Sequence, residues 1–341
     1  MAKAQQLIAL PEGNRTTFDA SVLFGKTEEM LRIQRTIDRV SAIRVPVLIR
    51  GESGSGKEVL ANHLHRISPW RDKPCIKVNC AAIPGTLLES ELFGYEKGSF
   101  TGAYNSRPGK FEMAHGGTMV LDEIADIDSG LQAKLLQVLQ DGCFSRIGDL
   151  EERRADVRIV SITNREIEGE IQRGSFREDL YYRINVVNLH VPPLRRRLED
   201  LPVLVEYFQR YYAQRYDRKV QPMPQSVIDR FRQHQWPGNI RELENYIKRY
   251  VILDSAESIV EELEERGRGP AAGAFQLPPV TDFSLKKFSK QACQQAEHYL
   301  ILEALKQTRW NRKRAAELLE ISYRALLYKI KEAGLPPKKR V

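Results

Sequence analysis

Residues 51–57 have the sequence GESGSGK and directly follow the apolar run 45–49. Glycines permit backbone angles at which successive N–H groups point toward phosphate oxygens, and a following helix turns its positive N-terminal end toward the same oxygens. Lys57 would add a positive charge beside the β- and γ-phosphates. The pattern therefore predicts a phosphate-binding loop between a strand and a helix. The residues expected to contact the nucleotide here are Gly51, Glu52, Ser53, Gly54, Ser55, Gly56, Lys57 and Glu58.

Two carboxylates, Asp122 and Glu123, follow another apolar run at 118–121. The carboxyl ends of parallel strands face the ligand crevice, so Asp122 is expected to hold Mg²⁺ and Glu123 to polarise the attacking water. Two surface acids at a capped strand end are the alternative, which the upstream loop disfavours. Glu58 stands where a Ser or Thr hydroxyl usually ligates Mg²⁺, so the metal would depend on Asp122, water and phosphate oxygens.

Another apolar run, 157–162, ends in the polar pair Thr163 and Asn164. We expect this pair to hydrogen-bond the γ-phosphate of ATP or its attacking water. Without the other motifs, an Asn at this position would indicate only a turn at the end of a strand.

These groups must be positioned by regular elements. Five β-rich runs, separated by helical stretches, lie at 45–49, 75–78, 118–121, 157–162 and 186–191. The alternation predicts an α/β fold with a parallel sheet covered on both faces. Helical spacing over 201–215 and 225–252 predicts a smaller all-helical domain, in which Asn239 caps a helix after a turn. Residues 265–287 are rich in Gly and Pro, which is typical of a linker.

The net charge of +8 is concentrated at one end of the chain. Residues 309–341 contain ten Lys and Arg against three Asp and Glu, a balance of +7. This distribution indicates that nucleic acid is bound there, although a solvated basic tail is the simpler alternative.

The chain has neither an apolar stretch of the ~20 residues that a membrane helix needs nor a secretory leader, so we expect a cytoplasmic protein. Its cysteines lack metal-ligand spacing and are expected to be reduced thiols; they are Cys75, Cys80, Cys143 and Cys293.

The C-terminal region predicts two helices, 311–319 and 323–332, separated by a short turn with Ser322 as N-cap. A helix, a tight turn and a basic helix form a helix-turn-helix. A basic helical hairpin that packs on the rest of the protein is the alternative. The residues expected to contact DNA are Ser322, Tyr323, Arg324 and Lys329. Those expected to contact phosphates are Arg312, Lys313 and Arg314.

The segment 91–103, ELFGYEKGSFTGA, together with the loop 51–57 and the two strand-end carboxylates, resembles the bacterial enhancer-binding activators of sigma-54 RNA polymerase. Those activators are AAA+ ATPases, and the resemblance covers about residues 22–335. Their signature is GAFTGA; here Ser99 stands where Ala is usual, and we expect the sigma-factor contact to survive. The residues that the resemblance assigns to this contact are Gly98, Ser99, Phe100, Thr101, Gly102 and Ala103.

The residues themselves indicate a mobile glycine-flanked loop with an apolar tip at Phe100; the alternative is that Phe100 folds back onto the domain. The resemblance implies that Arg177 and Arg183 are arginine fingers reaching the neighbouring subunit's nucleotide, although either Arg could instead form a local ion pair. It also implies that Asn79 restrains Glu123 and that Arg241 senses the γ-phosphate. The C-terminal helices resemble the Fis-type domain of the same activators.

The resemblance implies a homo-oligomeric ring, a hexamer in this family, with paired DNA-binding domains. Its function would be to bind double-stranded enhancer DNA and to use ATP hydrolysis to convert closed complexes of the sigma-54 RNA polymerase holoenzyme into open ones. The alternatives are a DNA-binding regulator that no longer drives sigma-54, and a general AAA+ remodelling or helicase-type motor.

About 22 residues precede the predicted ATPase core, and we expect no receiver domain. Either the sequence is part of a longer protein, or control comes from a separate regulatory protein, expression level or ring assembly. The expected domains are an N-terminal lead (1–22), an AAA+ α/β subdomain (23–191), a helical lid (192–264), a linker (265–288) and a helix-turn-helix domain (289–341).

Overall fold

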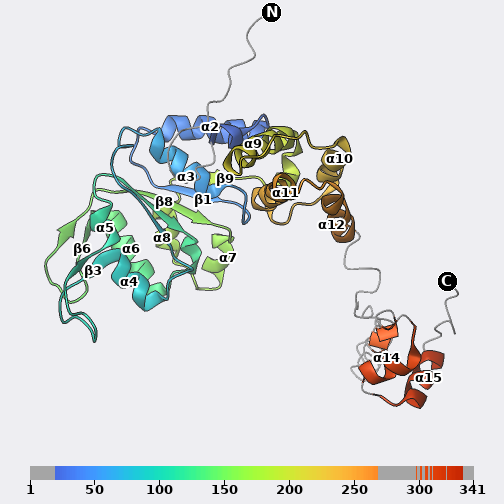
Figure 1. Cartoon of the computed structure of the whole chain (residues 1–341). Coiled ribbons are helices and arrows are strands. Elements are labelled where there is room, and N and C mark those ends of the chain that lie inside the picture. The colour runs from blue at the N-terminus through green and yellow to red at the C-terminus, as the bar shows by residue number, and fades with distance from the viewer. Residues whose placement is uncertain are drawn as a thin grey trace, which may run out of the picture. The chain divides into compact units, whose positions relative to one another are not determined.

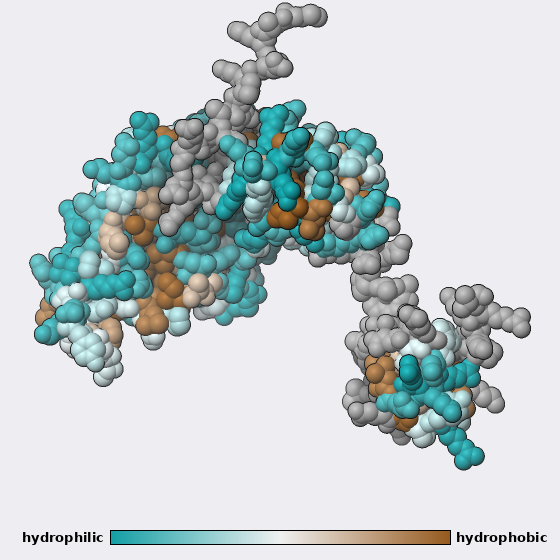
Figure 2. Space-filling view, viewed as in Figure 1, coloured by the Kyte–Doolittle hydropathy of each residue, from teal (hydrophilic) through white to brown (hydrophobic). Residues whose placement is uncertain are grey.

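The computed structural model describes residues 20–267, 297, 300, 301, 304, 305, 308, 310–319 and 321–332. The chain divides into two compact units, Met1–Ile259 and Val260–Val341, and each is described by itself. Figure 1 labels the elements of both units. Hydrophilic residues cover most of the visible face of the first unit, with apolar patches between them (Figure 2).

A five-stranded parallel sheet forms the centre of the first unit (Figure 1). Its strands, in the order β2-β5-β8-β1-β9, are β2 (Cys75–Asn79), β5 (Thr118–Asp122), β8 (Arg158–Thr163), β1 (Val47–Arg50) and β9 (Val187–His190). The predicted α/β fold and its five strands are confirmed. The register pairs Asn79 with Asp122 and Asp122 with Ile162, so the carboxyl ends of three strands meet at one edge.

Helices cover both faces of this sheet. On one face lies α3 (Lys57–Arg66), which contacts β1, β5 and β8, with α1 (Ala20–Phe24) and α2 (Glu28–Val40) nearby. On the other face α4 (Gly85–Phe93), α6 (Ser129–Asp141) and α8 (Glu178–Ile184) build an apolar core around strand residues such as Val78 and Met119. The short helices α5 (Lys110–Met113), η1 (Ile124–Asp126) and α7 (Ile167–Gln172) complete this part.

Two short hairpins that the sequence did not predict extend from this part. One pairs β3 (Gly94–Tyr95) with β4 (Arg107–Pro108), and the other pairs β6 (Cys143–Phe144) with β7 (Arg153–Arg154). We call the segments that they hold loop 1 (residues 96–106) and loop 2 (residues 145–152). Strands of two residues are too short for a periodic pattern of apolar and polar residues to show.

The lid follows β9 through η2 (Leu194–Arg196) and η3 (Leu198–Asp200). It contains α9 (Leu201–Arg215), α10 (Gln225–Gln233) and α11 (Asn239–Leu253), and α12 (Glu257–Gly267) comes after it in the chain. The helical prediction is confirmed, and residues 234–238, which include the turn expected before Asn239, divide the stretch 225–252 into two helices. There Trp236 adopts a φ of 52° and packs, fully buried, against Phe231 and Tyr246.

The prediction that Asn239 caps a helix is wrong. Gly238 is the N-cap of α11, and Asn239 is its fully buried first residue, with a φ of 52°. The Asn239 side chain instead accepts a hydrogen bond from the N–H of Leu194 and donates to the phosphate-binding loop. Cap propensity was outweighed because these buried backbone groups need partners.

In the second unit, α14 (Arg312–Leu318) and α15 (Tyr323–Glu332) are capped by Asn311 and Ser322, whose side chains accept hydrogen bonds from the N–H groups of Arg314 and Ala325. The predicted cap at Ser322 is confirmed. A small apolar core holds these helices; its buried members are Ile301, Ala304, Leu305, Ala315, Ala316, Leu326 and Ile330. Cys293 lies outside the described residues. Among the described helices, none combines the length and apolar character needed to cross a membrane.

Candidate functional site: a nucleotide pocket and its neighbouring loops

A pocket of ≈ 330 Å³ lies between the phosphate-binding loop, the carboxyl ends of the strands and the lid. The structure brings together most of the residues predicted from the sequence, and those lining the pocket are Ser53, Gly54, Gly56, Lys57, Glu58, Asn79, Asp122, Glu123 and Arg241. It also adds residues that the sequence analysis missed: Leu23, Val59, Ile162, Phe208, Ile240 and Glu244. The apolar members of this second group resemble ordinary core residues in the sequence, so no signal marked them.

The phosphate-binding loop depends on its glycines. Gly54 has a φ of 75°, and a Cβ added there would lie 2.4 Å from the carbonyl oxygen of Gly238. Lys57 begins α3, and its Nζ donates hydrogen bonds to the carbonyl oxygens of Gly51 at 2.8 Å and Glu52 at 3.0 Å. Burial lowers the pKa of Lys57. The buried Ser55 hydroxyl has no hydrogen-bond partner among the described residues, so the loop retains polar capacity for a phosphate.

The two strand-end carboxylates have different surroundings. Glu123 has a φ of 54°, and its Oε2 accepts a hydrogen bond from the backbone N–H of Asn164 at 3.1 Å. Asp122 Oδ2 lies 3.0 Å from Lys77 Nζ, a residue that the sequence analysis missed. The Asp122 carboxylate is thus partly buried and already pairs with a cationic side chain. Carboxylate oxygens are ligands that Mg²⁺ prefers, so Asp122 fits a metal-binding role.

The other polar residues at these strand ends bond to nearby backbone. Asn79 Oδ1 accepts hydrogen bonds from the N–H groups of Ala81 and Ala82, so the loop after β2 fixes its side chain. Thr163 is fully buried, and its hydroxyl accepts from the N–H of Arg165. Of the predicted pair Thr163 and Asn164, Asn164 contacts Glu123, and it does so through its backbone N–H rather than its side chain.

The lid is hydrogen-bonded directly to the phosphate-binding loop. The N–H groups of Ile240 and Arg241, at the start of α11, donate to the carbonyl oxygen of Gly54, and the Arg241 side chain donates to Ser53 Oγ at 3.0 Å. Arg195 forms a bidentate pair with Glu52, which also accepts from Asn239. The Arg195 guanidinium lowers the pKa of Glu52 to about 2. Backbone and side-chain hydrogen bonds therefore link the phosphate-binding loop to the first turn of α11.

Both predicted arginine fingers lie on or beside α8 and are exposed. Arg177 precedes the helix and pairs with Asp179 at 2.6 Å. Arg183 donates to the carbonyl oxygen of Leu139 at 2.9 Å and lines a second cavity of ≈ 320 Å³. Arg177 thus forms the local ion pair that the sequence alternative allowed, whereas the partner of Arg183 is a backbone carbonyl rather than an acid.

Loop 1 is a tight turn that presents an aromatic ring. The N–H of Gly98 donates to the carbonyl oxygen of Ala103, and Gly98 and Gly102 have φ values of 86° and 111°. Phe100 packs edge-on against Tyr95, with ring centroids 5.0 Å apart, yet remains 44% exposed. The ring therefore rests on the domain while one side stays accessible.

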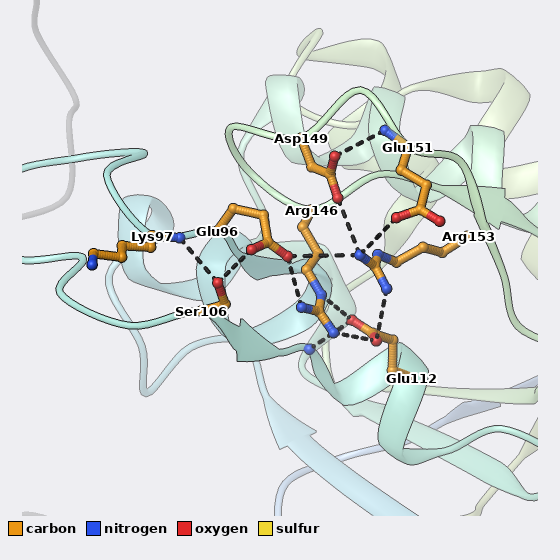
Figure 3. A network of polar contacts seen from close by, with 9 residues as sticks. Glu96, Lys97, Ser106, Glu112, Arg146, Asp149, Glu151 and Arg153 are labelled. Atoms are coloured by element: carbon orange, nitrogen blue, oxygen red, sulfur yellow. Dashed lines mark hydrogen bonds and ion pairs between the residues drawn. The ribbon is translucent and has the colours of Figure 1, made fainter.

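An ion-pair network, shown in Figure 3, joins the bases of loops 1 and 2. Arg146 donates two hydrogen bonds to Glu112, at 2.8 and 2.7 Å, and one to Glu96 at 2.8 Å. Arg153 lies 3.1 Å from Asp149 and 3.6 Å from Glu96. These hydrogen bonds raise the pKa of Arg146, so the network is charged at neutral pH. The sequence pattern predicts loop 1, but no local pattern in the sequence predicts the ion pairs that support it.

The second unit places most of the predicted DNA-contacting residues on its surface. Lys313, Arg314, Ser322, Tyr323 and Arg324 are exposed, and Arg312 is half-buried. Lys329 is half-buried and forms an ion pair with Glu297. A basic helix α15 thus follows a capped turn, as a helix-turn-helix requires.

Together, a parallel sheet with a phosphate-binding loop, a helical lid and a separate helical unit define an AAA+ ATPase-type domain joined to a helix-turn-helix. The family comparisons agree. The chain matches the Sigma-54 interaction domain over residues 23–190, the AAA+ ATPase lid domain over 195–269 and the Bacterial regulatory protein, Fis family, over 293–332. The chain belongs to the family of sigma-54-dependent transcriptional activators.

Similar proteins span the matched regions. The Regulatory protein AtoC of Escherichia coli K12 is 44% identical over 314 residues, covering 90% of this chain and 67% of AtoC. The Nif-specific regulatory protein of Azotobacter vinelandii is 40% identical, and the chain covers 60% of its length. The chain therefore spans about two thirds of the length of these relatives.

Solved structures show the same fold. NtrX from Brucella abortus in complex with ATP has a TM-score of 0.67 and 32% identity, covering 91% of this chain and 69% of NtrX. Hsp104 of S. cerevisiae in a casein complex has a TM-score of 0.52 at 17% identity, covering 71% of this chain and 47% of Hsp104, which is a likeness of fold alone.

Proposed function

We propose that the protein is an ATP-hydrolysing transcription activator. It binds double-stranded enhancer DNA upstream of a promoter and uses ATP hydrolysis to convert closed complexes of the sigma-54 RNA polymerase holoenzyme into open complexes. The observation that carries this proposal is the placement, in one compact unit, of a nucleotide pocket and the Phe100 loop. Family membership supports the choice of polymerase, and the basic α15 supports DNA as the second partner.

ATP would place its phosphates along the loop 51–57, where Lys57 exchanges its carbonyl partners for phosphate oxygens. Asp122 would hold Mg²⁺, whose charge would offset the charge that develops on the β- and γ-phosphate oxygens. Glu123 would accept a proton from the attacking water, and the N–H of Asn164 would keep its carboxylate in position. Asn79 would restrain Glu123 until the γ-phosphate is sensed, with Arg241 reporting that phosphate to the lid.

Arg177 and Arg183 would act on the nucleotide of an adjacent subunit in a homo-oligomeric ring, which we propose to be a hexamer. Their local partners would be given up on assembly, because a permanently charged planar guanidinium matches the charge on a phosphoryl group in transfer. Single-chain pairing and a role between subunits are compatible, since Arg177 and Asp179 are both about half exposed.

Hydrolysis would then move loop 1 against the sigma factor. The Phe100 ring would leave Tyr95 and enter an apolar site on the sigma factor, with Thr101 beside it and with Gly98 and Gly102 as hinges. The network around Arg146 would carry loop 2 along with loop 1. Paired second units would contact DNA through α15 and the residues at the start of α14.

The decisive experiment measures open-complex formation on a sigma-54 promoter with ATP, polymerase and this protein. Phe100→Ala should abolish promoter opening while ATP turnover stays near the wild-type rate. Tyr104→Ala, a change of an exposed aromatic residue just after the turn, is the matched control and should keep most of the opening activity.

If wild-type protein hydrolyses ATP and binds DNA but opens no promoter, the protein is a regulator that no longer drives sigma-54. If Phe100→Ala opens promoters as well as the wild type, the loop does not transmit the work of hydrolysis, and the proposed mechanism is wrong.

A further inference from the structure

Strand β2 places a cation beside the nucleotide pocket. Side chains alternate along a strand, so Val78 points into the core while Lys77 and Asn79 share the opposite face. Asn79 lines the pocket, and Lys77 is therefore directed toward the same region.

Lys77 contacts two carboxylates there. Its Nζ lies 2.8 Å from Glu58 Oε2 and 3.0 Å from Asp122 Oδ2. Glu58 comes from the first turn of α3, and Asp122 ends β5, the strand next to β2. A single ammonium group thus bridges the residue assigned to Mg²⁺ and the residue that replaces the usual metal-ligating hydroxyl.

A role in stability alone accounts poorly for this arrangement. The Lys77 side chain is 35% exposed, and its partners Glu58 and Asp122 are 53% and 16% exposed; ion pairs made by an accessible lysine contribute little to folding. Glu58 is already favoured near the positive end of α3, and β2 pairs with β5 over five residue positions without help from side chains. The position of Lys77 matters mainly for what Asp122 can bind.

We propose that Lys77 is the counter-cation of the metal site, a positioning residue that acts through Asp122. In the absence of a divalent cation it holds Asp122, and it releases Asp122 to Mg²⁺ when ATP and Mg²⁺ bind. It then stays paired with Glu58, which offers the displaced ammonium a second carboxylate where a Ser or Thr would offer none. The proposal rests on the proposed function only in placing ATP and Mg²⁺ in this pocket.

This exchange has two consequences of opposite sign. Competition for Asp122 raises the Mg²⁺ concentration that the protein needs. In the absence of metal, the same positive charge stands near the phosphates and strengthens ATP binding. A residue with a purely structural role would change neither quantity selectively.

The test uses the full chain and two variants, Lys77→Met and Lys73→Met, the latter removing an exposed lysine just before β2. Binding of a fluorescent ATP analogue is titrated in EDTA, and the affinity of the protein–ATP complex for Mn²⁺ is measured from the paramagnetic resonance of free Mn²⁺. In Lys77→Met we expect Mn²⁺ to bind about threefold to tenfold more tightly and metal-free ATP to bind severalfold more weakly. Lys73→Met should match the wild type in both.

Two further variants give opposite expectations. Glu58→Gln leaves the ammonium with Asp122 alone, so Mn²⁺ should bind more weakly, whereas Lys77→Arg should restore most of the wild-type behaviour. The proposal is overturned if Lys77→Met binds Mn²⁺ like Lys73→Met or more weakly, or if Glu58→Gln binds it more tightly. These readings need only nucleotide and metal binding, so a failure of promoter opening would leave them intact.

Discussion

Glu123 occupies a backbone conformation that most residues avoid. Its φ of 54° lies in the left-handed region, where a non-glycine residue costs of order 1–3 kcal/mol. The N–H of Asn164 holds its carboxylate, and Asp122 directly before it completes β5. In the proposed mechanism, these two adjacent acids at the strand end would have different tasks, with Asp122 on the metal and Glu123 on the attacking water.

Replacing Glu123 with Gln should separate ATP binding from hydrolysis. The amide keeps the size of the side chain but cannot accept a proton, so we expect ATP affinity to change little and kcat to fall by about 10²–10⁴. Steady-state ATPase assays and nucleotide titration measure the two quantities. Glu166→Gln, which changes an exposed acid before α7, serves as control. An unchanged kcat in Glu123→Gln would assign proton transfer to another group.

The ion pair between Glu52 and Arg195 should make a pH-dependent contribution to the free energy of unfolding. Arg195 lowers the pKa of Glu52 from 4.5 to about 2, so the pairing stabilises the folded state above pH 4.5 and is lost as the pH falls from 4.5 toward 2. Glu52→Gln should unfold at a lower urea concentration than wild type at pH 7, and the difference should shrink at pH 3. The effect is small because both side chains are about 40% exposed. A difference that grows on acidification would contradict this assignment.

At the scale of elements, hydrogen bonds and ion pairs join the two hairpins to each other. Backbone hydrogen bonds join Glu96 to Ile147 and Ile147 to Gly94, and Arg146 adds the ion pairs shown in Figure 3. Arg146 is only 14% exposed, so its hydrogen bonds are better shielded from solvent than those of a surface pair.

Arg146→Ala should loosen both loops while leaving the nucleotide pocket intact. Removing the guanidinium leaves Glu96 and Glu112 without their main partner, so the hydrogen bonds that join the two loops are lost. Hydrogen exchange should accelerate at backbone amides of loops 1 and 2, and ATP affinity should be unchanged. Arg107→Ala, which removes a more exposed arginine from β4, should produce a smaller change. Unaltered exchange in loop 1 would show that the backbone pairing alone holds it.

At the scale of the whole molecule, the described residues that line the nucleotide pocket include Arg241 but neither Arg177 nor Arg183. Arg177 and Arg183 are exposed on α8 beside their own local partners, Asp179 and the carbonyl oxygen of Leu139. In the proposed ring, Arg177 and Arg183 would reach the nucleotide of an adjacent subunit, so ATPase activity should depend on assembly.

Mixing two inactive variants tests this dependence. The Arg177→Ala variant retains Glu123, and the Glu123→Gln variant retains Arg177. In a mixed ring, some subunit interfaces therefore combine Glu123 of one subunit with Arg177 of the adjacent subunit. Random mixing in equal amounts should give both residues at about a quarter of the subunit interfaces and should restore ATPase activity in proportion. Each variant alone should stay inactive at every concentration. No recovery on mixing would mean that Arg177 acts within its own chain.

Much of the fold could be predicted because its signals are local. Apolar runs marked all five strands of the sheet, and the spacing of GESGSGK marked the loop between β1 and α3. Indications of secondary structure in the sequence were weaker in the two short hairpins and in residues 234–238, which precede α11. Asn is a residue type that often caps helices. Only the packing of the lid showed that the Asn239 amide instead forms hydrogen bonds with Glu52, Ser53 and Leu194.

By itself, the sequence determined the order of the strands along the chain and the residue types around the phosphates, because these depend on neighbours in the chain. The tertiary structure decided which distant groups meet: Lys77 with Asp122, Arg146 with Glu96 and Glu112, and α11 with the phosphate-binding loop. Charged and hydrogen-bonding side chains act over only a few ångströms and have many possible partners. Their pairing is therefore settled only when the sheet and lid bring them within reach.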